Sequence, residues 1–424
     1  MIPRVRPSYS LAELRAAFRP AGDAVVRFEQ ELAAHFGARH ALVFPYGRSA
    51  IYSCLRALDR AGGEVVQPAY NCVVVAHATV VAGYRPAFVD VQAHSPNQDP
   101  QAMIDRVGPE TAAVVPTSMF GYSFDAPALC NAIRRRNPTA LIIADCCQCF
   151  DARWQGELLA TQGDVAVLAF GIGKPMTSLY GGALLTNRDD VAQAVRRYRD
   201  SSFRPQRRSA AVRQRLYLLA SWLALSGPAV RLTDFIENGN TPLRRYLVTL
   251  RAREAIRLPV DNELLMTAEE AAVGRVQLRR VAGFLARRRA IAGRYARELS
   301  SIADLDLLVW PDGSAYAIYA ARLRAPETRA SILAALRRAG VQGDKTLSYV
   351  VPGLQCYRAE GYGDEAFPNA VAWASSVINL PNHPTLTEAQ VSRIVHGVRD
   401  AFRQAAVART DVQGSLHAAP LQTK

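Results

Sequence analysis

The sequence predicts an α/β protein in which a mostly parallel sheet lies between two layers of helices. Short, continuous apolar runs recur along the first half of the chain, and helical stretches stand between several of them. Runs that are apolar on both sides are typical of strands buried on both faces, as in parallel sheets. Half of the 424 residues are hydrophobic, which is ample for a large core and suggests two or three domains.

The elements follow in order. Apolar residues recur at helical spacing over 25–38, and this helix is expected to end at Gly37. A buried strand, "HALVF", follows, and "GRSAIYSCLRAL" then indicates a glycine turn that opens into a helix. Further strands are expected at 64–68, 85–91, 111–116, 140–145, 164–170 and 181–186, with a helix at 125–137. Functional groups should gather where parallel strands end.

The segment 204–257 departs from this pattern, because it is rich in arginine and holds an apolar patch at Leu216–Val230. The patch is short for a membrane span and contains Gly227 and Pro228. The favoured interpretation is a helical hairpin packed on the body or on a partner subunit. The alternative is a basic segment that makes a peripheral membrane contact.

The remainder predicts a second, smaller α/β unit. A long helix is expected at 267–301, a strand at 314–324, and helices at 329–340 and 386–402. We therefore predict a large domain over 1–257, a small C-terminal domain over 258–406, and a disordered tail over 407–424.

Charge and cysteine content limit the function classes. The net charge of +14 is not gathered into a basic tail or a nucleic-acid-binding motif, so no nucleic acid is expected; anionic substrates or membranes are compatible with it. Seven scattered cysteines and the absence of a long apolar stretch near the start favour a reducing cytoplasm without a signal peptide. Cys146, Cys147 and Cys149 are spaced too tightly for zinc pairs, so no metal is expected.

Lysine usage points to one residue. The chain has only three lysines, Lys174, Lys345 and Lys424, and Lys174 lies in the glycine-rich stretch "AFGIGKPMTSLYGGALL". Asp145 ends the buried strand at 140–145 and Lys174 follows the next strand, so both side chains should meet in one crevice. They form either a structural ion pair or the pair that pyridoxal 5'-phosphate needs, in which the lysine forms a Schiff base and the acid keeps the pyridine nitrogen protonated. Arginine cannot form that bond, which favours the cofactor.

Six blocks carry a resemblance to a known family: "FEQELAAHFGARHALVF", "GRSAIYSCLRAL", "EVVQPAYNCVVVAHATVVAGYRPAFVDV", "IIADCCQCFDARWQGELLATQGDVAVLAFGIGKPMTSLYGGALLTN", "MTAEEAAVGRVQLRRVAGFLARRRAIAGRYARELS" and "VINLPNHPTLTEAQVSRI". Together they resemble the DegT/DnrJ/EryC1/StrS sugar aminotransferases from roughly Arg27 to Phe402. The resemblance implies the PLP-transferase fold type I, with a mostly parallel seven-stranded sheet in the large domain.

The resemblance also assigns roles. Lys174 would bond the cofactor and move protons, Asp145 would pair with the pyridinium nitrogen, and Gln148 would face the phenolic oxygen. Small buried thiols would stand beside the cofactor. The related sugar dehydratases typically have histidine at the lysine position, so Lys174 argues against dehydration.

Gly47, Arg48 and Ser49 would hold the cofactor phosphate at a helix N-terminus. Gly47 could instead serve only the turn, and Arg48 could lie on the surface. The ring-stacking position aligns with Cys72, so Tyr70 either supplies the aromatic ring or packs in the core.

Several positions depart from the family pattern. Ala169 replaces a phosphate-binding serine, and Phe150 replaces a histidine. Asn262 is a candidate for the residue that family members donate across the dimer. The resemblance implies a homodimer that moves an amino group from an amino acid, glutamate in the leading interpretation, to a keto-sugar, most often nucleotide-linked. A PLP-dependent sugar dehydratase and a non-catalytic scaffold or regulator are the alternatives.

Overall fold

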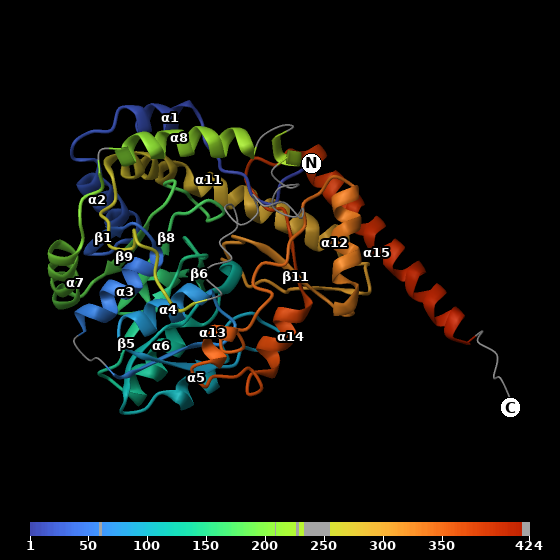
Figure 1. Cartoon of the computed structure of the whole chain (residues 1–424), viewed down its shortest axis with the longest axis horizontal. Coiled ribbons are helices and arrows are strands. Elements are labelled where there is room, and N and C mark those ends of the chain that lie inside the picture. The colour runs from blue at the N-terminus through green and yellow to red at the C-terminus, as the bar shows by residue number, and fades with distance from the viewer. Residues whose placement is uncertain (59–61, 208, 226–228, 233–254, 418–424) are drawn as a thin grey trace.

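The computed structural model describes residues 1–58, 62–207, 209–225, 229–232 and 255–417 (Figure 1). Within these residues, seven strands form the main sheet in the order β1, β9, β8, β5, β4, β2, β3. Strand β9 is antiparallel to both of its neighbours, and the other pairs are parallel. The strands are β1 (His40–Phe44), β2 (Glu64–Pro68), β3 (Arg85–Val89), β4 (Thr111–Val114), β5 (Leu141–Asp145), β8 (Val165–Ala169) and β9 (Gly182–Thr186). Each apolar run that predicted a strand in this half is confirmed.

Helices cover both faces of this sheet, because successive strand residues point to opposite sides. On one side, Val65, Ile143 and Val167 pack with helices α3 and α7. On the other side, Ala144 and Leu168 pack with α2 and α11, while α5 and α6 cover the far strands. The helices are α2 (Ala24–Phe36), α3 (Gly47–Ala57), α4 (Val73–Val81), α5 (Pro100–Arg106), α6 (Ala126–Arg136), α7 (Asp189–Ser202) and α11 (Ala268–Leu299). The predicted end of α2 is confirmed, since Gly37 has φ +64°.

Helix α11 belongs to two hydrophobic cores. Its first half, including Leu278 and Leu285, packs in the core of the large sheet, and its second half, including Ile291 and Leu299, packs in the small-domain core. The change from one core to the other therefore lies within α11, downstream of the predicted boundary at 257. A single amphipathic helix can serve both cores because its apolar stripe is continuous.

The small domain holds a three-stranded antiparallel sheet in the order β10, β11, β12. Its elements are β10 (Leu305–Leu307), β11 (Tyr319–Leu323), β12 (Val377–Leu380), α12 (Arg329–Arg338), α13 (Gln355–Arg358), α14 (Pro368–Ser376) and α15 (Glu388–His417). Strand β11 starts five residues later than predicted, because Tyr316 has φ +50° and breaks the extended backbone. Short strands β6 (Arg153–Trp154) and β7 (Glu157–Leu158) pair separately.

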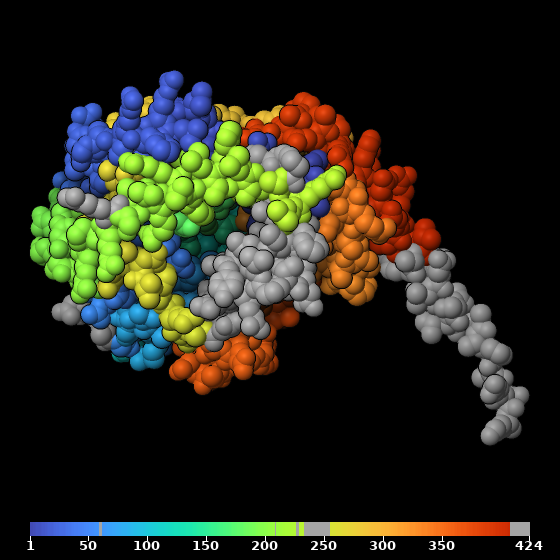
Figure 2. Space-filling view, turned by 45° about the horizontal axis from the view of Figure 1, so that its top comes forward, coloured from blue at the N-terminus to red at the C-terminus, as the bar shows by residue number. Residues whose placement is uncertain are grey.

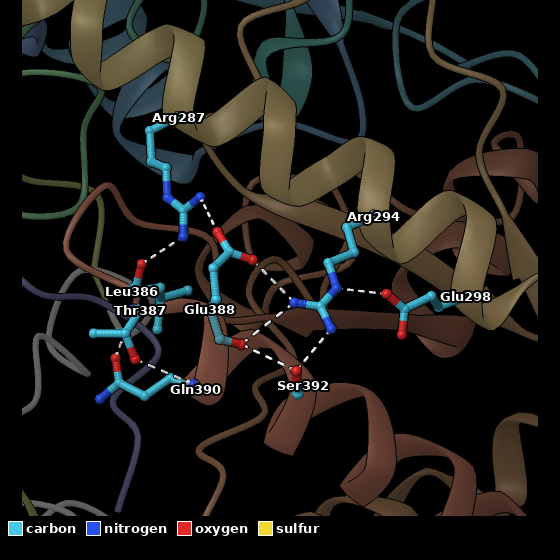
Figure 3. A network of polar contacts seen from close by, with 8 residues as sticks. All are labelled: Arg287, Arg294, Glu298, Leu386, Thr387, Glu388, Gln390 and Ser392. Carbon is cyan, nitrogen blue, oxygen red and sulfur yellow. Dashed lines mark hydrogen bonds and ion pairs between the residues drawn. The ribbon is translucent and has the colours of Figure 1, made fainter.

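A polar network fixes the start of α15 to α11 (Figure 3). Arg287 and Arg294 both pair with Glu388, and Arg294 also donates to the Ser392 hydroxyl at 2.7 Å. Arg287 donates to the Leu386 carbonyl at 2.7 Å, so the chain entering α15 is held as well. Helix α15 then continues to His417, past residue 407, at which the disordered tail is predicted to begin. Helix propagation adds a hydrogen bond for each residue that is ordered. Residues 418–424 lie outside the described residues.

The first arm of the atypical segment is helix α8 (Ser209–Ala224). It lies beside α1 (Leu11–Phe18) and contacts α11 (Figures 1 and 2). Arg215 pairs with Glu269 at 3.1 Å and donates to the Ala17 carbonyl at 3.0 Å, and Tyr217 stacks on Tyr180. This arm therefore packs on the body, and residues 233–254 of the predicted hairpin lie outside the described residues. In the described part of the chain, no helix is both long and apolar enough to cross a membrane.

The N-terminus of α11 contains a buried acid that makes stability depend on pH. Thr267 and Glu270 form a capping box, and burial raises the pKa of Glu270 from 4.5 to about 7. Because the folded state binds this proton more tightly, the stabilisation is complete below pH 4.5 and is lost as the pH rises through 7. We expect Glu270→Gln, which keeps the capping box, to raise the free energy of unfolding at pH 8 by roughly 3 kcal/mol.

The measurement is urea denaturation of wild type and variant at pH 8 and at about pH 3. The two proteins should have equal stability at about pH 3, where Glu270 is protonated in both the folded and the unfolded state. A stabilisation that is equal at both pH values would contradict this account.

Candidate active site

The site lies where β5 and β8 end. Asp145 is the last residue of β5 and is 5% exposed. Its Oδ1 accepts a hydrogen bond from the Cys147 N–H at 3.0 Å. Among the described residues, no cationic side chain forms an ion pair with it. A buried carboxylate without a cation is costly, so this position favours a ligand that brings a positive charge.

Lys174 lies in the loop that joins β8 to β9, and its side chain is partly exposed. Backbone hydrogen bonds close this loop at its base, from Phe170 to Gly181 at 2.8 Å and from Ser178 back to Phe170 at 2.9 Å. Leu179 is fully buried with φ +74°, a conformation that costs a leucine free energy and that the packing around it must maintain. Hydrogen bonds at its base and packing around Leu179 therefore fix the conformation of the loop that carries Lys174.

Asp145 and Lys174 both lie close enough to the Cys147 thiol to act on it electrostatically. Burial raises the pKa of this thiol, the Asp145 carboxylate raises it further, and the Lys174 ammonium lowers it. Cys72, at the start of α4, also acts on it electrostatically. The structure thus gathers Lys174, Asp145 and Cys72 around one thiol that sequence reasoning assigned only as a neighbour.

The start of α3 lies against Cys147 and Ala169. A Cβ added to Gly47 would lie 2.9 Å from the Cys147 Sγ and 3.1 Å from the Ala169 Cβ, so only glycine permits this approach. The first-turn amides of a helix have no partner within the helix and favour an anion. Arg48 places its guanidinium 4.5 Å from the centre of the Tyr46 ring and is partly exposed.

Ser49 is fixed by a buried contact with Asn262 of the same chain. The Ser49 hydroxyl donates to the Asn262 Oδ1 at 2.8 Å, and the neighbouring Asp261 accepts from the Tyr46 hydroxyl at 2.7 Å. Asn262 therefore reaches the start of α3 within one chain. No spacing rule in the sequence indicated the contact between Asp261 and Tyr46, since 215 residues separate them.

We expect Ser49→Ala to lower the free energy of unfolding by about 1–3 kcal/mol, because the buried Asn262 acceptor loses its donor. Ser53→Ala is a matched control on the same helix, since the buried Ser53 hydroxyl has no hydrogen-bond partner among the described residues. Chemical denaturation of the two variants is the measurement. Equal losses would show that the Ser49 hydrogen bond does not stabilise this site.

Gln148 and Tyr70 have different surroundings. The Gln148 Oε1 accepts from the Phe120 N–H at 2.9 Å, and Gln148 itself is partly exposed near the site. Tyr70 is fully buried, with its ring against Phe120 and Trp373, which is the packing alternative for this residue. Cys72, by contrast, is partly exposed and acts electrostatically on the Cys147 thiol.

These groups fit pyridoxal phosphate. The buried carboxylate of Asp145 lacks a cation that a protonated pyridine nitrogen would supply. The N-terminus of α3 offers amides to a phosphate, and the amine of Lys174 is the nucleophile that the cofactor aldehyde requires. In the described residues, no group of three His, Cys, Asp or Glu side chains is arranged to hold a metal ion.

A family model described as the DegT/DnrJ/EryC1/StrS aminotransferase family matches residues 11–399. The chain belongs to this family. The protein is thus an aminotransferase, and the fold predicted from the resemblance is confirmed. The family and its PLP-bound structures imply pyridoxal phosphate as the cofactor.

The similarity to relatives and to solved structures covers nearly the whole chain. The chain is 24% identical to GDP-perosamine synthase of Caulobacter vibrioides over 88% of this chain and 89% of that protein. It is 27% identical to dTDP-3-amino-3,4,6-trideoxy-alpha-D-glucose transaminase of Micromonospora megalomicea over 90% of each chain. The PLP form of the putative sugar aminotransferase Spr1654 of Streptococcus pneumoniae has a TM-score of 0.74, with 18% identity over 95% of this chain and 99% of that chain.

Proposed function

We propose that this aminotransferase moves the amino group of an amino acid, in the first instance L-glutamate, to a keto-sugar linked to a nucleotide. The observation that carries the proposal is that Asp145 ends β5 and Lys174 follows β8, its parallel neighbour, so both lie at the carboxyl ends of adjacent strands. The names of the two relatives, each acting on a nucleotide-linked amino sugar, support the substrate class.

Each residue then has a definite task. When bound, pyridoxal phosphate supplies an electron sink for the carbon next to the amino group. With the cofactor bound, Asp145 would keep the pyridine nitrogen protonated, and the Lys174 amine would take up a proton from the substrate carbon and release it again during the transfer. Ser49, held by Asn262, and the first amides of α3 position the phosphate.

Two further expectations belong to this proposal. The protein acts as a homodimer, as the family resemblance implies. It acts in the cytoplasm, and the observation that no disulfide joins any of the seven cysteines in the described residues is compatible with a reducing compartment.

The test is transfer of nitrogen. The protein with pyridoxal phosphate is incubated with ¹⁵N-labelled L-glutamate and a panel of nucleotide-linked keto-sugars, and the products are analysed by mass spectrometry. The expected result is a labelled amino sugar together with an equal amount of 2-oxoglutarate.

The other outcomes separate the alternatives. Loss of water from the sugar without incorporation of nitrogen would support a dehydratase instead. If no amino acid transfers nitrogen to any sugar, the proposal is wrong. Lys174→Arg is the control, because it keeps the charge but not the nucleophile.

A further inference from the structure

Helix α8 presents its apolar side to solvent. Its inward positions include Gln214 and Ser221, whereas Val212, Leu216 and Leu223 lie outward. The outward leucines are 61% and 60% exposed, at positions 216 and 223. The spacing of these three residues places them on one stripe of the helix.

Polar contacts fix which side of helix α8 faces the body of the protein. The Gln214 Oε1 accepts from the Thr267 hydroxyl at 2.6 Å, at the N-terminal cap of α11. Arg215 binds Glu269 and the Ala17 carbonyl on the same side, and Leu218 is fully buried. Rotation of α8 to bury its leucines would break these contacts, so the apolar stripe is a fixed feature of the surface.

Helix α1 extends this surface. Figure 2 shows α1 and α8 side by side on one face of the molecule, and Leu11 and Phe18 of α1 are 70% and 49% exposed. We call the exposed residues of these two helices the α1–α8 face. Large apolar side chains that gather in one exposed region mark an interaction site.

The charges of this face have one sign. Arg15, Arg19, Arg207 and Arg213 are exposed on α1, on α8 or next to them. Helix α8 contains no acidic residue, and the one acid of α1, Glu13, is fully buried. Segment 204–257 carries eleven arginines and three acidic residues in the sequence. Apolar side chains flanked by arginine and free of exposed acids are the pattern of a helix that lies on an anionic membrane.

A second copy of the chain fits this face less well. A two-fold interface places the same patch of each subunit against its copy, which would bring the exposed arginines of one face towards those of the other. Like charges at such an interface cost free energy, whereas anionic headgroups neutralise them.

We propose that the α1–α8 face binds the surface of an anionic membrane, with Leu216 and Leu223 inserted among the lipids and the arginines on the headgroups. The proposal concerns a place of action and does not depend on the reaction that the enzyme performs. It assigns helix α8 of the atypical segment, whose role the family resemblance leaves open, to the attachment of a transferase to a membrane surface.

The test is vesicle sedimentation of the full chain. The wild type should sediment with vesicles of phosphatidylcholine and phosphatidylglycerol in equal parts, should not sediment with pure phosphatidylcholine, and should be released at high salt. Leu216→Gln combined with Leu223→Gln should lower the partition coefficient at least ~tenfold. Arg207→Gln combined with Arg213→Gln should lower it roughly fivefold for each arginine.

A matched control removes two exposed valines from other helices, by Val81→Gln and Val371→Gln, and should bind as the wild type does. Circular dichroism and the unfolding temperature check that each variant is folded. If the wild type binds neither kind of vesicle, or if the leucine variants bind as the wild type does, the proposal is overturned. A change of oligomeric state by light scattering in the leucine variants, without vesicle binding by the wild type, would assign the face to a second copy instead.

Discussion

Replacing Lys174 with alanine is expected to lower the rate of amino transfer by at least about 10⁴-fold, since the residue supplies both the nucleophile and the proton carrier. Of the other two lysines, Lys345 is exposed in the small domain and Lys424 lies outside the described residues. The visible absorption band of the protein with pyridoxal phosphate should be lost in the variant. Addition of L-glutamate should then change the spectrum of the wild type only.

Lys345→Ala is the matched control, because Lys345 is exposed in the small domain and should leave both the band and the rate unchanged. Lys174→Arg should behave as the alanine variant does. If the alanine variant keeps its band, Lys174 is not the residue that bonds the cofactor, and the non-catalytic alternative would gain support.

Replacing Asp145 with asparagine should lower the rate roughly 10²-fold or more, the loss typical of one preorganised electrostatic partner. The pyridine nitrogen would then lose the carboxylate that keeps it protonated. The same change should leave the cofactor-free protein at least as stable as the wild type, because it removes a buried charge without a cation and keeps the acceptor for Cys147. A loss of activity together with an unchanged or higher unfolding temperature is therefore the expected pair of results.

The measurements are steady-state transfer kinetics and thermal unfolding of the cofactor-free proteins. Asp306→Asn, at an exposed position of β10, is the control and should change neither. A variant of Asp145 that unfolds early and also loses activity would show a structural role for the carboxylate.

The sequence by itself determined the strands of the large sheet and indicated Asp145 and Lys174 as the candidate functional residues. Buried strands appear as continuous apolar runs, and the chain direction places their last residues, such as Asp145, at one edge of the sheet. Lys174 was identifiable because this chain uses arginine for nearly all its other basic positions. Periodicity also located α11, whose capping box is formed by Thr267 and Glu270, which are close together in the sequence.

Only the tertiary structure decided what lies beside these residues. Tyr70 is in the core and Asn262 is bonded to Ser49, because packing brings together residues that are far apart in the chain. The capping box of α11 is formed by residues close together in the sequence, whereas the burial that raises the pKa of Glu270 depends on the tertiary structure. The outward stripe of α8 could not be read from periodicity, which shows that a helix has an apolar face but not which face the body covers. That choice was made by Gln214 and Arg215, whose partners lie on α11 and α1.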